Sequence, residues 1–270
     1  MVAGVASVFV VKDLQKSFLW RAKGVERETV ALTDVNIEVD QGEFVCLLGP
    51  SGCGKTTLLQ MMAGLDSPTG GVIQFEGKPI NGPDPNRCYV FQRFVLFPWL
   101  TALGNVEFGL RFQHYGAEER RQRALAAMRL VGLERFVDHY PFEMSGGMQQ
   151  RIAIALALVI EPRALLMDEP FGSLDAQTRS QMQRELIRIW MGELQSRVTI
   201  VFVTHDITES LLLADRVVLL SARPGRVKEI YKVDMPRPRD PFSDAFVSLE
   251  KRIFRDLEDE IARTKLEEQI

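Results

Sequence analysis

Short apolar runs, separated by polar segments that contain glycine or proline, recur along the chain and predict β-strands. They span residues 8–11, 35–39, 44–48, 71–75, 164–167, 199–203 and 216–220. The last three are apolar except for Thr199 and Arg216 at their first positions, as expected of strands in a parallel sheet with both faces covered. Residues 22–29 and 82–86 are polar or proline-rich and are predicted to be loops. The pattern therefore predicts an α/β core with a mainly parallel sheet.

Apolar residues change to helical spacing between about residue 94 and residue 159, which predicts a helical subdomain inserted into this core. Leu125, Met128 and Val131 share one helix face behind a polar start at residues 118–123. A C-terminal stripe consists of Phe246, Leu249, Ile253, Leu257 and Ile261. We expect this stripe to pack against the rest of the protein rather than to form a separate module.

Length and composition fit one main domain with an insertion. The chain has 270 residues, of which 46% are hydrophobic and 26% charged, so it can bury a substantial core. A formal net charge of −3 provides no bulk attraction to a phosphate backbone. Nucleic acid is therefore not expected as the main partner.

The cysteines and the apolar stretches bear on the cellular compartment. Cys46, Cys53 and Cys88 are odd in number and lack metal-site spacing, which predicts a reducing compartment rather than a disulfide framework. The longest apolar stretch, residues 152–160, is about half of what spans a bilayer, and no basic segment precedes the first apolar residues. We expect other subunits to do any membrane spanning.

A glycine-rich segment between a predicted strand and a predicted helix has the composition of a phosphate-binding loop. Residues 49–56 fit the pattern G-x-x-x-x-G-K-[ST], and we call them the phosphate loop. Its glycines let backbone N–H groups face an anion, and the helix N-terminus adds partial positive charge. Lys55 is expected to reach the β- and γ-phosphates of ATP, and Thr56 to bind Mg²⁺. The expected nucleotide contacts are Gly49, Pro50, Ser51, Gly52, Cys53, Gly54, Lys55, Thr56 and Thr57.

Two alternatives concern this loop. A chance glycine loop is disfavoured by the strand before it and the helix after it. Cys53 is interpreted as a tolerated loop residue rather than a redox sensor, but its place predicts that thiol alkylation disturbs nucleotide binding.

Two adjacent carboxylates follow the apolar strand at residues 164–167. Asp168 and Glu169 are thereby placed at the carboxyl edge of the sheet, where such folds bind ligands. Asp168 suits Mg²⁺, and Glu169 suits a general base that polarises the attacking water. His205 follows the strand at residues 199–203 in the same way and is expected to contact the γ-phosphate. The alternatives are an acidic loop and a structural histidine, and Gln92 is uninformative on its own.

A second potential anion site lies at the start of the helix that contains residues 152–160. Ser145, Gly146 and Gly147 would provide a hydroxyl and N–H groups there. A simple helix cap is the alternative. Two phosphate-facing helix starts with only one phosphate loop suggest that the second completes the site of another copy.

Over roughly residues 8–227, these motifs resemble the ATPase subunit of an ATP-binding cassette (ABC) transporter. The resemblance implies a P-loop NTPase (RecA-like) core with a mainly parallel sheet, an N-terminal antiparallel β subdomain and an inserted α-helical subdomain. It also implies a head-to-tail homodimer with two ATP, in which residues 145–149, including Gln149, act as the signature motif. By the same resemblance, Gln92 touches magnesium, Asp175 belongs to the D-loop, His205 is the switch histidine and Phe18 stacks on adenine. Met144, Met148 and Phe18 depart from the commonest leucine, glutamine and tyrosine.

Within the family, residues 97–100, 105–106, 145–151 and 221–226 resemble the nitrate, sulfonate and taurine importer group. This implies a peripheral subunit on the cytoplasmic face of the membrane, bound to a two-copy permease that is fed by a solute-binding protein. Residues 93–99 either face the permease or pack internally.

On this basis, residues 8–240 are expected to form the ATPase domain, with the helical subdomain at about 94–159, and residues 241–270 a helical tail. A soluble ABC-type ATPase acting on nucleic acid or ribosomes is the alternative, disfavoured by the single cassette and the charge. A small-molecule P-loop kinase is disfavoured by the segment at residues 145–149.

Overall fold

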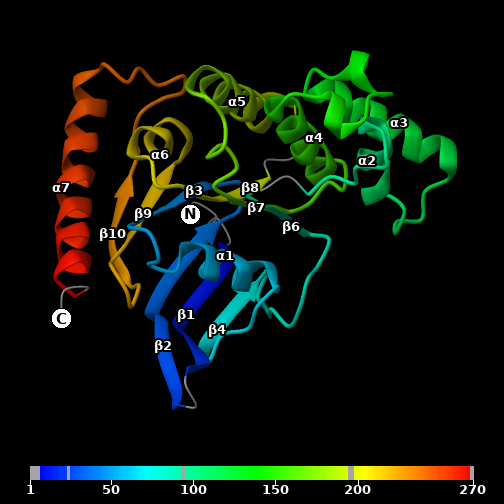
Figure 1. Cartoon of the computed structure of the whole chain (residues 1–270). Coiled ribbons are helices and arrows are strands. Elements are labelled where there is room, and N and C mark those ends of the chain that lie inside the picture. The colour runs from blue at the N-terminus through cyan, green and yellow to red at the C-terminus, as the bar shows by residue number, and fades with distance from the viewer. Residues whose placement is uncertain (1–6, 23–24, 93–94, 194–197, 268–270) are drawn as a thin grey trace, which may run out of the picture. The chain divides into compact units, whose positions relative to one another are not determined.

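The computed structural model describes residues 7–22, 25–92, 95–193 and 198–267. These fall into two compact units. The first unit consists of two segments, one that ends at Pro83 and one that begins at Thr199. The second unit is Asp84–Val198. Each unit is described by itself, with the elements labelled as in Figure 1.

An antiparallel sheet in the first unit has the strand order β2-β1-β4-β5. Its strands are β1 (Ser7–Ala22), β2 (Val25–Asp40), β4 (Gly70–Phe75) and β5 (Lys78–Pro79). The predicted antiparallel β subdomain is confirmed, but the predicted loop at residues 22–29 is wrong, because residues 25–29 belong to β2. Cross-strand contacts explain the difference: Trp20 Nε1 donates to Thr29 Oγ1 at 2.9 Å, and Arg27 lies 5.7 Å from the Trp20 ring centroid.

A mainly parallel sheet forms the rest of the first unit's core. β3 (Phe44–Leu48) lies between β8 (Thr199–Val203) and β9 (Arg216–Leu220) and runs parallel to both, while β10 (Val227–Lys232) is antiparallel to β9. β3 and β8 are buried along their whole length, as their unbroken apolar runs predict. α1 (Lys55–Ala63) follows β3, and α6 (Ile207–Leu213) follows β8.

The C-terminal helix α7 (Asp244–Glu267) runs beside α6 and β10 (Figure 1). Phe246, Ile253 and Leu257 of the predicted stripe are buried, and Leu249 is half-buried. Ile261 is 38% exposed, so the packed part of the stripe ends before it. Sequence periodicity missed Glu260, which is buried on the same helix.

The second unit contains two parallel strands and the helical insertion. β6 (Arg87–Val90) pairs with β7 (Ala164–Asp168), and α5 (Ala176–Arg188) continues into a π-helical turn at Ile189–Glu193. The packed helices of the insertion are α2 (Ala102–Gly109), α3 (Ala117–Leu130) and α4 (Gly146–Leu158), with 3₁₀ turns at Glu134–Phe136 and Pro141–Glu143.

The predicted start of this helical subdomain at about residue 94 falls outside the described residues. Within them, the first helix of the insertion begins at Ala102. Of the predicted face on α3, Met128 and Val131 are buried and Leu125 is half-buried, while Ala124 and Ala127 are also buried. Among the helices of the described residues, none combines the length and the apolar character that a bilayer crossing requires.

Candidate functional site

The phosphate loop joins β3 to α1 in a conformation that depends on glycine. Gly54 is the N-cap of α1 with φ +99°, in the left-handed region that residues with a Cβ rarely adopt. A Cβ at this position would lie 2.6 Å from Leu32 Cδ2. Because a glycine cap has no side chain, the first N–H groups of α1 are available to an anionic ligand.

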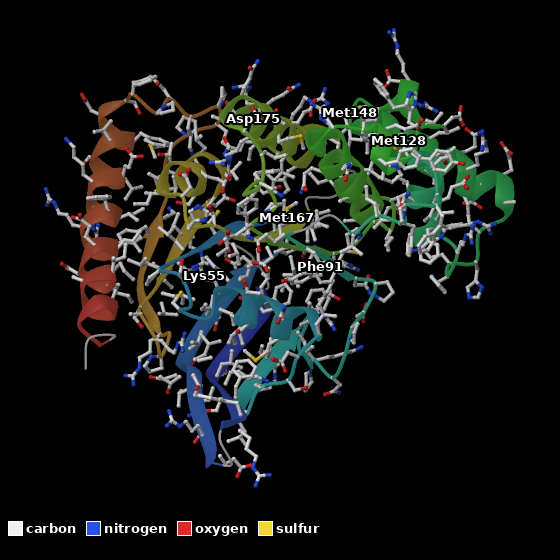
Figure 2. All side chains as sticks on the ribbon, in the orientation of Figure 1. Lys55, Phe91, Met128, Met148, Met167 and Asp175 are labelled. Carbon is white, nitrogen blue, oxygen red and sulfur yellow. The ribbon has the colours of Figure 1, made fainter. Side chains whose placement is uncertain are left out.

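Lys55 is enclosed by the phosphate loop. Its Nζ donates to the carbonyl oxygens of Gly49 at 2.7 Å and Pro50 at 2.9 Å, and the residue is only 6% exposed. Figure 2 labels Lys55 at the start of α1. The neighbouring Thr56 is exposed, and Thr57 is half-buried.

Cys53 is a buried residue of the loop. Burial raises the pKa of its thiol, and the nearby Lys55 ammonium offsets this rise only in part. The structure therefore agrees with the interpretation of Cys53 as a structural residue rather than a reactive thiol.

His205 and Phe18 are the other candidate residues of the first unit. His205 is exposed directly after β8, in a turn that is held by its neighbours: Asp206 N donates to Thr204 Oγ1 at 3.0 Å. Phe18 lies on β1 and is 43% exposed, with Lys16 Nζ 4.9 Å from its ring centroid. An exposed aromatic ring beside a cation can stack on a base.

The carboxylate pair of the second unit lies at the carboxyl end of β7, as predicted. Asp168 is 6% exposed and accepts a hydrogen bond from the Tyr89 hydroxyl at 2.9 Å. Glu169 has φ +41°, a strained conformation for a non-glycine residue and one that is enriched at functional sites. Gln92 Nε2 donates to Glu169 Oε2 at 3.4 Å, so the structure brings these two candidates together. Tyr89 was missed, because its apolar run gave no sign that its hydroxyl reaches Asp168.

The second predicted anion site is a helix start. Ser145 is the N-cap of α4, and its Oγ accepts a hydrogen bond from Met148 N at 3.3 Å. Gly146 is exposed beside it, while a Cβ on Gly147 would lie 2.6 Å from Thr178 Cγ2 at the start of α5. The two glycines therefore serve different needs: one leaves its backbone accessible, and the other permits close packing.

Gln149 and Asp175 are both engaged within the second unit. Gln149 Nε2 donates to the carbonyl oxygens of Pro141 at 2.8 Å and Met144 at 3.2 Å. Asp175 caps α5 by accepting from the N–H groups of Gln177 at 3.1 Å and Thr178 at 3.0 Å, and the bond from Thr178 is the largest cause that lowers its pKa. Met148 and Asp175 are labelled at the starts of α4 and α5 in Figure 2.

Each unit carries an oxygen ligand of the kind that Mg²⁺ prefers. The first unit has the hydroxyl of Thr56, and the second has the carboxylate of Asp168. Within the described ranges, no group of three or more histidine, cysteine, aspartate or glutamate residues could hold a metal by itself. An ion bound by few protein ligands together with nucleotide phosphates fits both observations.

Residues 221–226, which in the sequence contribute only to the resemblance to one importer group, form a loop that lies against the phosphate loop. We call residues 221–226 the buttress loop. Arg223 Nε lies 3.4 Å from Gly52 O, and a Cβ on Gly225 would lie 2.1 Å from Cys53 O. Its glycine and proline content was visible in the sequence, but its partner was not.

Comparison with known proteins agrees with these features. The ABC transporter family matches residues 32–172. The nitrate import ATP-binding protein NrtD of Synechocystis sp. is 45% identical over 226 residues, covering 84% of this chain and 82% of that protein. The aliphatic sulfonates import ATP-binding protein SsuB of Bacillus licheniformis is 42% identical over 231 residues, covering 86% and 88%.

A solved structure extends the likeness to three dimensions. The ATP-binding cassette MJ0796, in a dimeric post-hydrolysis state bound to ADP and Pi, aligns with a TM-score of 0.72 and 35% identity. The alignment covers 84% of this chain and 100% of that one. The predicted P-loop NTPase fold and the predicted resemblance are therefore confirmed. The chain belongs to the ABC transporter family and is one of its ATP-hydrolysing cassettes.

Proposed function

We propose that this chain energises the import of a small anion of the nitrate, sulfonate or taurine kind, as the ATPase subunit of an ABC importer. The observation that carries the ATPase role is the phosphate loop with its enclosed lysine ammonium group. The import role and the solute class rest on relatives that are named for nitrate and aliphatic sulfonate import.

The candidate residues have the following proposed roles in ATP binding and hydrolysis. Lys55 and the N–H groups of residues 49–57 bind the phosphates, and Phe18 stacks on adenine. Glu169 orients and deprotonates the attacking water, and His205 holds the γ-phosphate. Thr56, Asp168 and Gln92 would hold Mg²⁺, which supplies charge compensation on the phosphates when bound.

A second copy of the chain completes each site. Ser145, Gly146 and Gly147 place a hydroxyl and N–H groups at the start of α4, where they would meet the γ-phosphate held by the partner. Gln149 supports this segment through its bonds to Pro141 and Met144, and Asp175 shapes the adjoining turn. Two ATP molecules would then join two copies head to tail.

The partners of this dimer would be a two-copy permease and, through it, a solute-binding protein, with the chain peripheral on the cytoplasmic face of the membrane. An aromatic chain in the second unit fits a permease contact. Its ring centroids lie 5.5 Å apart for Phe97 and Trp99, 4.4 Å for Phe97 and Phe108, and 5.8 Å for Phe108 and Phe112. Trp99 is 70% and Phe112 83% exposed, whereas Phe97 is half-buried, so this segment provides both internal packing and an exposed apolar surface.

For the domains, we propose an ATPase domain at residues 8–240 that contains the helical subdomain at about 94–159. A C-terminal helical tail would occupy residues 241–270. The single helix α7 within the tail supports this division.

The test is solute uptake by vesicles that contain the chain with its permease and solute-binding protein. ATP should drive uptake of nitrate, an alkanesulfonate or taurine, and Glu169→Gln should abolish both uptake and ATP hydrolysis while ATP binding persists, because the water loses its base. Glu161→Gln is a matched control, since Glu161 also has a positive φ of +56° but pairs with Arg123 at 2.9 Å. Hydrolysis retained by Glu169→Gln would refute the assigned base.

Other results would overturn the larger proposal. ATPase activity that responds to DNA or ribosomes but not to the permease would favour the alternative function. Uptake of bicarbonate or of a cation in place of the three named solutes would refute the solute class but not the importer.

A further inference from the structure

The buttress loop is joined to the phosphate loop at close range. Gly225 N donates to Ala31 O at 2.9 Å, and Thr33 N donates to Gly225 O at 3.1 Å, so the backbone of Gly225 is fixed on both sides. Its α-carbon then faces Cys53 so closely that an added Cβ would lie 2.1 Å from the Cys53 carbonyl oxygen. Any displacement of Gly225 toward Cys53 must therefore move the phosphate loop.

The buttress loop is also fixed internally. Ser221 N donates to Arg226 O at 2.9 Å, and Arg226 N donates to Ser221 Oγ at 3.0 Å. The Ser221 hydroxyl lies 3.2 Å from Pro224 O. These bonds close the loop on itself and link its first residue to its last.

The other end of the buttress loop is held by α7. Glu260 on this helix is 1% exposed; its Oε2 accepts from Ala222 N at 2.9 Å, and its Oε1 pairs with Lys228 Nζ at 2.9 Å. Lys228 also donates to Asp256 O, and the Tyr231 hydroxyl donates to the Asp256 carboxylate. A buried carboxylate needs such partners, because leaving it unpaired is expensive.

A further bond joins α7 to α6. The hydroxyl of Thr208, three residues after His205, donates to Glu250 Oε1 on α7. The helix thus holds two segments of the first unit that adjoin proposed phosphate contacts: α6, which begins two residues after His205, and the buttress loop, which lies against Cys53.

We propose that α7 acts through Glu260 and the buttress loop as a brace that positions the phosphate loop for ATP. Glu260 and Gly225 are positioning residues in this scheme, since neither needs to touch the nucleotide. The proposal rests on nucleotide binding by the phosphate loop and assigns a role in ATP affinity to the C-terminal tail.

The test compares ATP affinity and turnover in full-length variants. Glu260→Gln weakens the bonds to Ala222 N and Lys228, and Gly225→Ala forces a methyl group against Cys53 O. Each should raise the Kd of Mg-ATP roughly tenfold or more, because small misplacements of ligand-holding groups have effects of that order. The kcat at saturating ATP should stay within about twofold, since the groups that act on the water are unchanged.

Two matched controls separate positioning from general damage. Gly82→Ala adds a methyl group where no heavy atom lies within 4 Å, and Lys251→Gln alters an exposed residue of α7. Both should leave the Kd unchanged. Hydrogen exchange of amides 52–55 should accelerate in Glu260→Gln and not in the controls.

The outcomes are distinguishable. If Glu260→Gln melts cooperatively and binds Mg-ATP within twofold of the parent chain, the brace is refuted. If Glu260→Gln does not fold, the test uses Gly225→Ala and a substitution of the exposed Arg223, Arg223→Ala. An unchanged Kd of Mg-ATP in both of these variants would also refute the brace. Failure of the parent chain to bind ATP would instead refute the phosphate-loop assignment.

Discussion

At the scale of single residues, the side chain of Lys55 is positioned by hydrogen bonds to the backbone of the phosphate loop. The carbonyl oxygens of Gly49 and Pro50 hold the ammonium group within the loop. These bonds stabilise the loop before ATP arrives, and a phosphate can replace them without a large movement of the lysine. The backbone of Glu169 is also held in place by its surroundings, because a strained positive φ persists only where the neighbouring structure imposes it.

Burial of Cys53 should lower the rate at which its thiol is alkylated. Burial raises the pKa of this thiol despite the nearby Lys55 ammonium, so little thiolate exists at neutral pH. N-ethylmaleimide should therefore modify Cys53 far more slowly than free glutathione at pH 7, and the rate should keep rising above pH 8.5, the approximate ordinary pKa of a thiol.

Mass spectrometry of the peptide that contains Cys53, over a series of pH values, provides this measurement. Once modified, the protein should lose ATP binding, because the adduct would lie within the phosphate loop. A rate that levels off below about pH 8.5 would contradict the raised pKa.

At the scale of elements, Asn105 organises the segment that precedes α2. It is fully buried, and its Oδ1 accepts from Phe97 N at 2.7 Å. Its Nδ2 lies within 3.2 Å of the carbonyl oxygens of Phe97, Leu100 and Thr101. One amide thus adds to the backbone bonds of this turn, in which Leu100 N donates to Phe97 O at 3.1 Å and Asn105 N donates to Thr101 O at 2.9 Å.

Asn105→Ala should lower the free energy of unfolding by about 2–3 kcal/mol, since it removes the amide that pairs with Phe97 N and Leu100 O. Residues 95–101 should also become more sensitive to limited proteolysis. Gln122→Ala on α3 is the control, because that side chain makes one exposed bond, to Glu118 at 2.8 Å. Equal denaturation midpoints and equal cleavage for the two variants would show that Asn105 does not organise the segment.

At the scale of the whole molecule, the proposed site is shared between two copies, which a mixing experiment can test. Lys55→Met removes the phosphate-loop charge of one half, and Ser145→Arg blocks the helix start of the other. Each variant alone should be inactive. Mixed in equal amounts, they should recover about a quarter of the parent activity, since half of the dimers would be mixed and each would have one intact site.

The control is a mixture of Lys55→Met with Glu169→Gln. Both substitutions damage the half of the site that we assign to a copy's own ATP, so no intact site can form and no activity should return. Recovery in this control, or none in the first mixture, would contradict the shared arrangement. Activity per molecule should also rise with protein concentration, as association into dimers requires.

The strands of the core and the chemistry at their ends follow from the amino-acid sequence alone. The apolar runs at residues 44–48, 200–203 and 217–220 lie in β3, β8 and β9, since burial of both faces leaves no room for alternation. The phosphate loop could be recognised because its glycines and Lys55 meet local requirements of backbone geometry and charge. Such requirements act between neighbours in the chain, so they are visible in one dimension.

Only the tertiary structure decided the contacts between distant segments. Polar residues 25–29 pair with β1 because a cross-strand partner outweighs their composition. Tyr89 meets Asp168, and Glu260 meets Ala222, over separations of 79 and 38 residues. No periodicity marks such bonds, because they depend on which surfaces the fold brings together. For that reason the helical stripe of α7 was predictable, while the buried carboxylate on it was not.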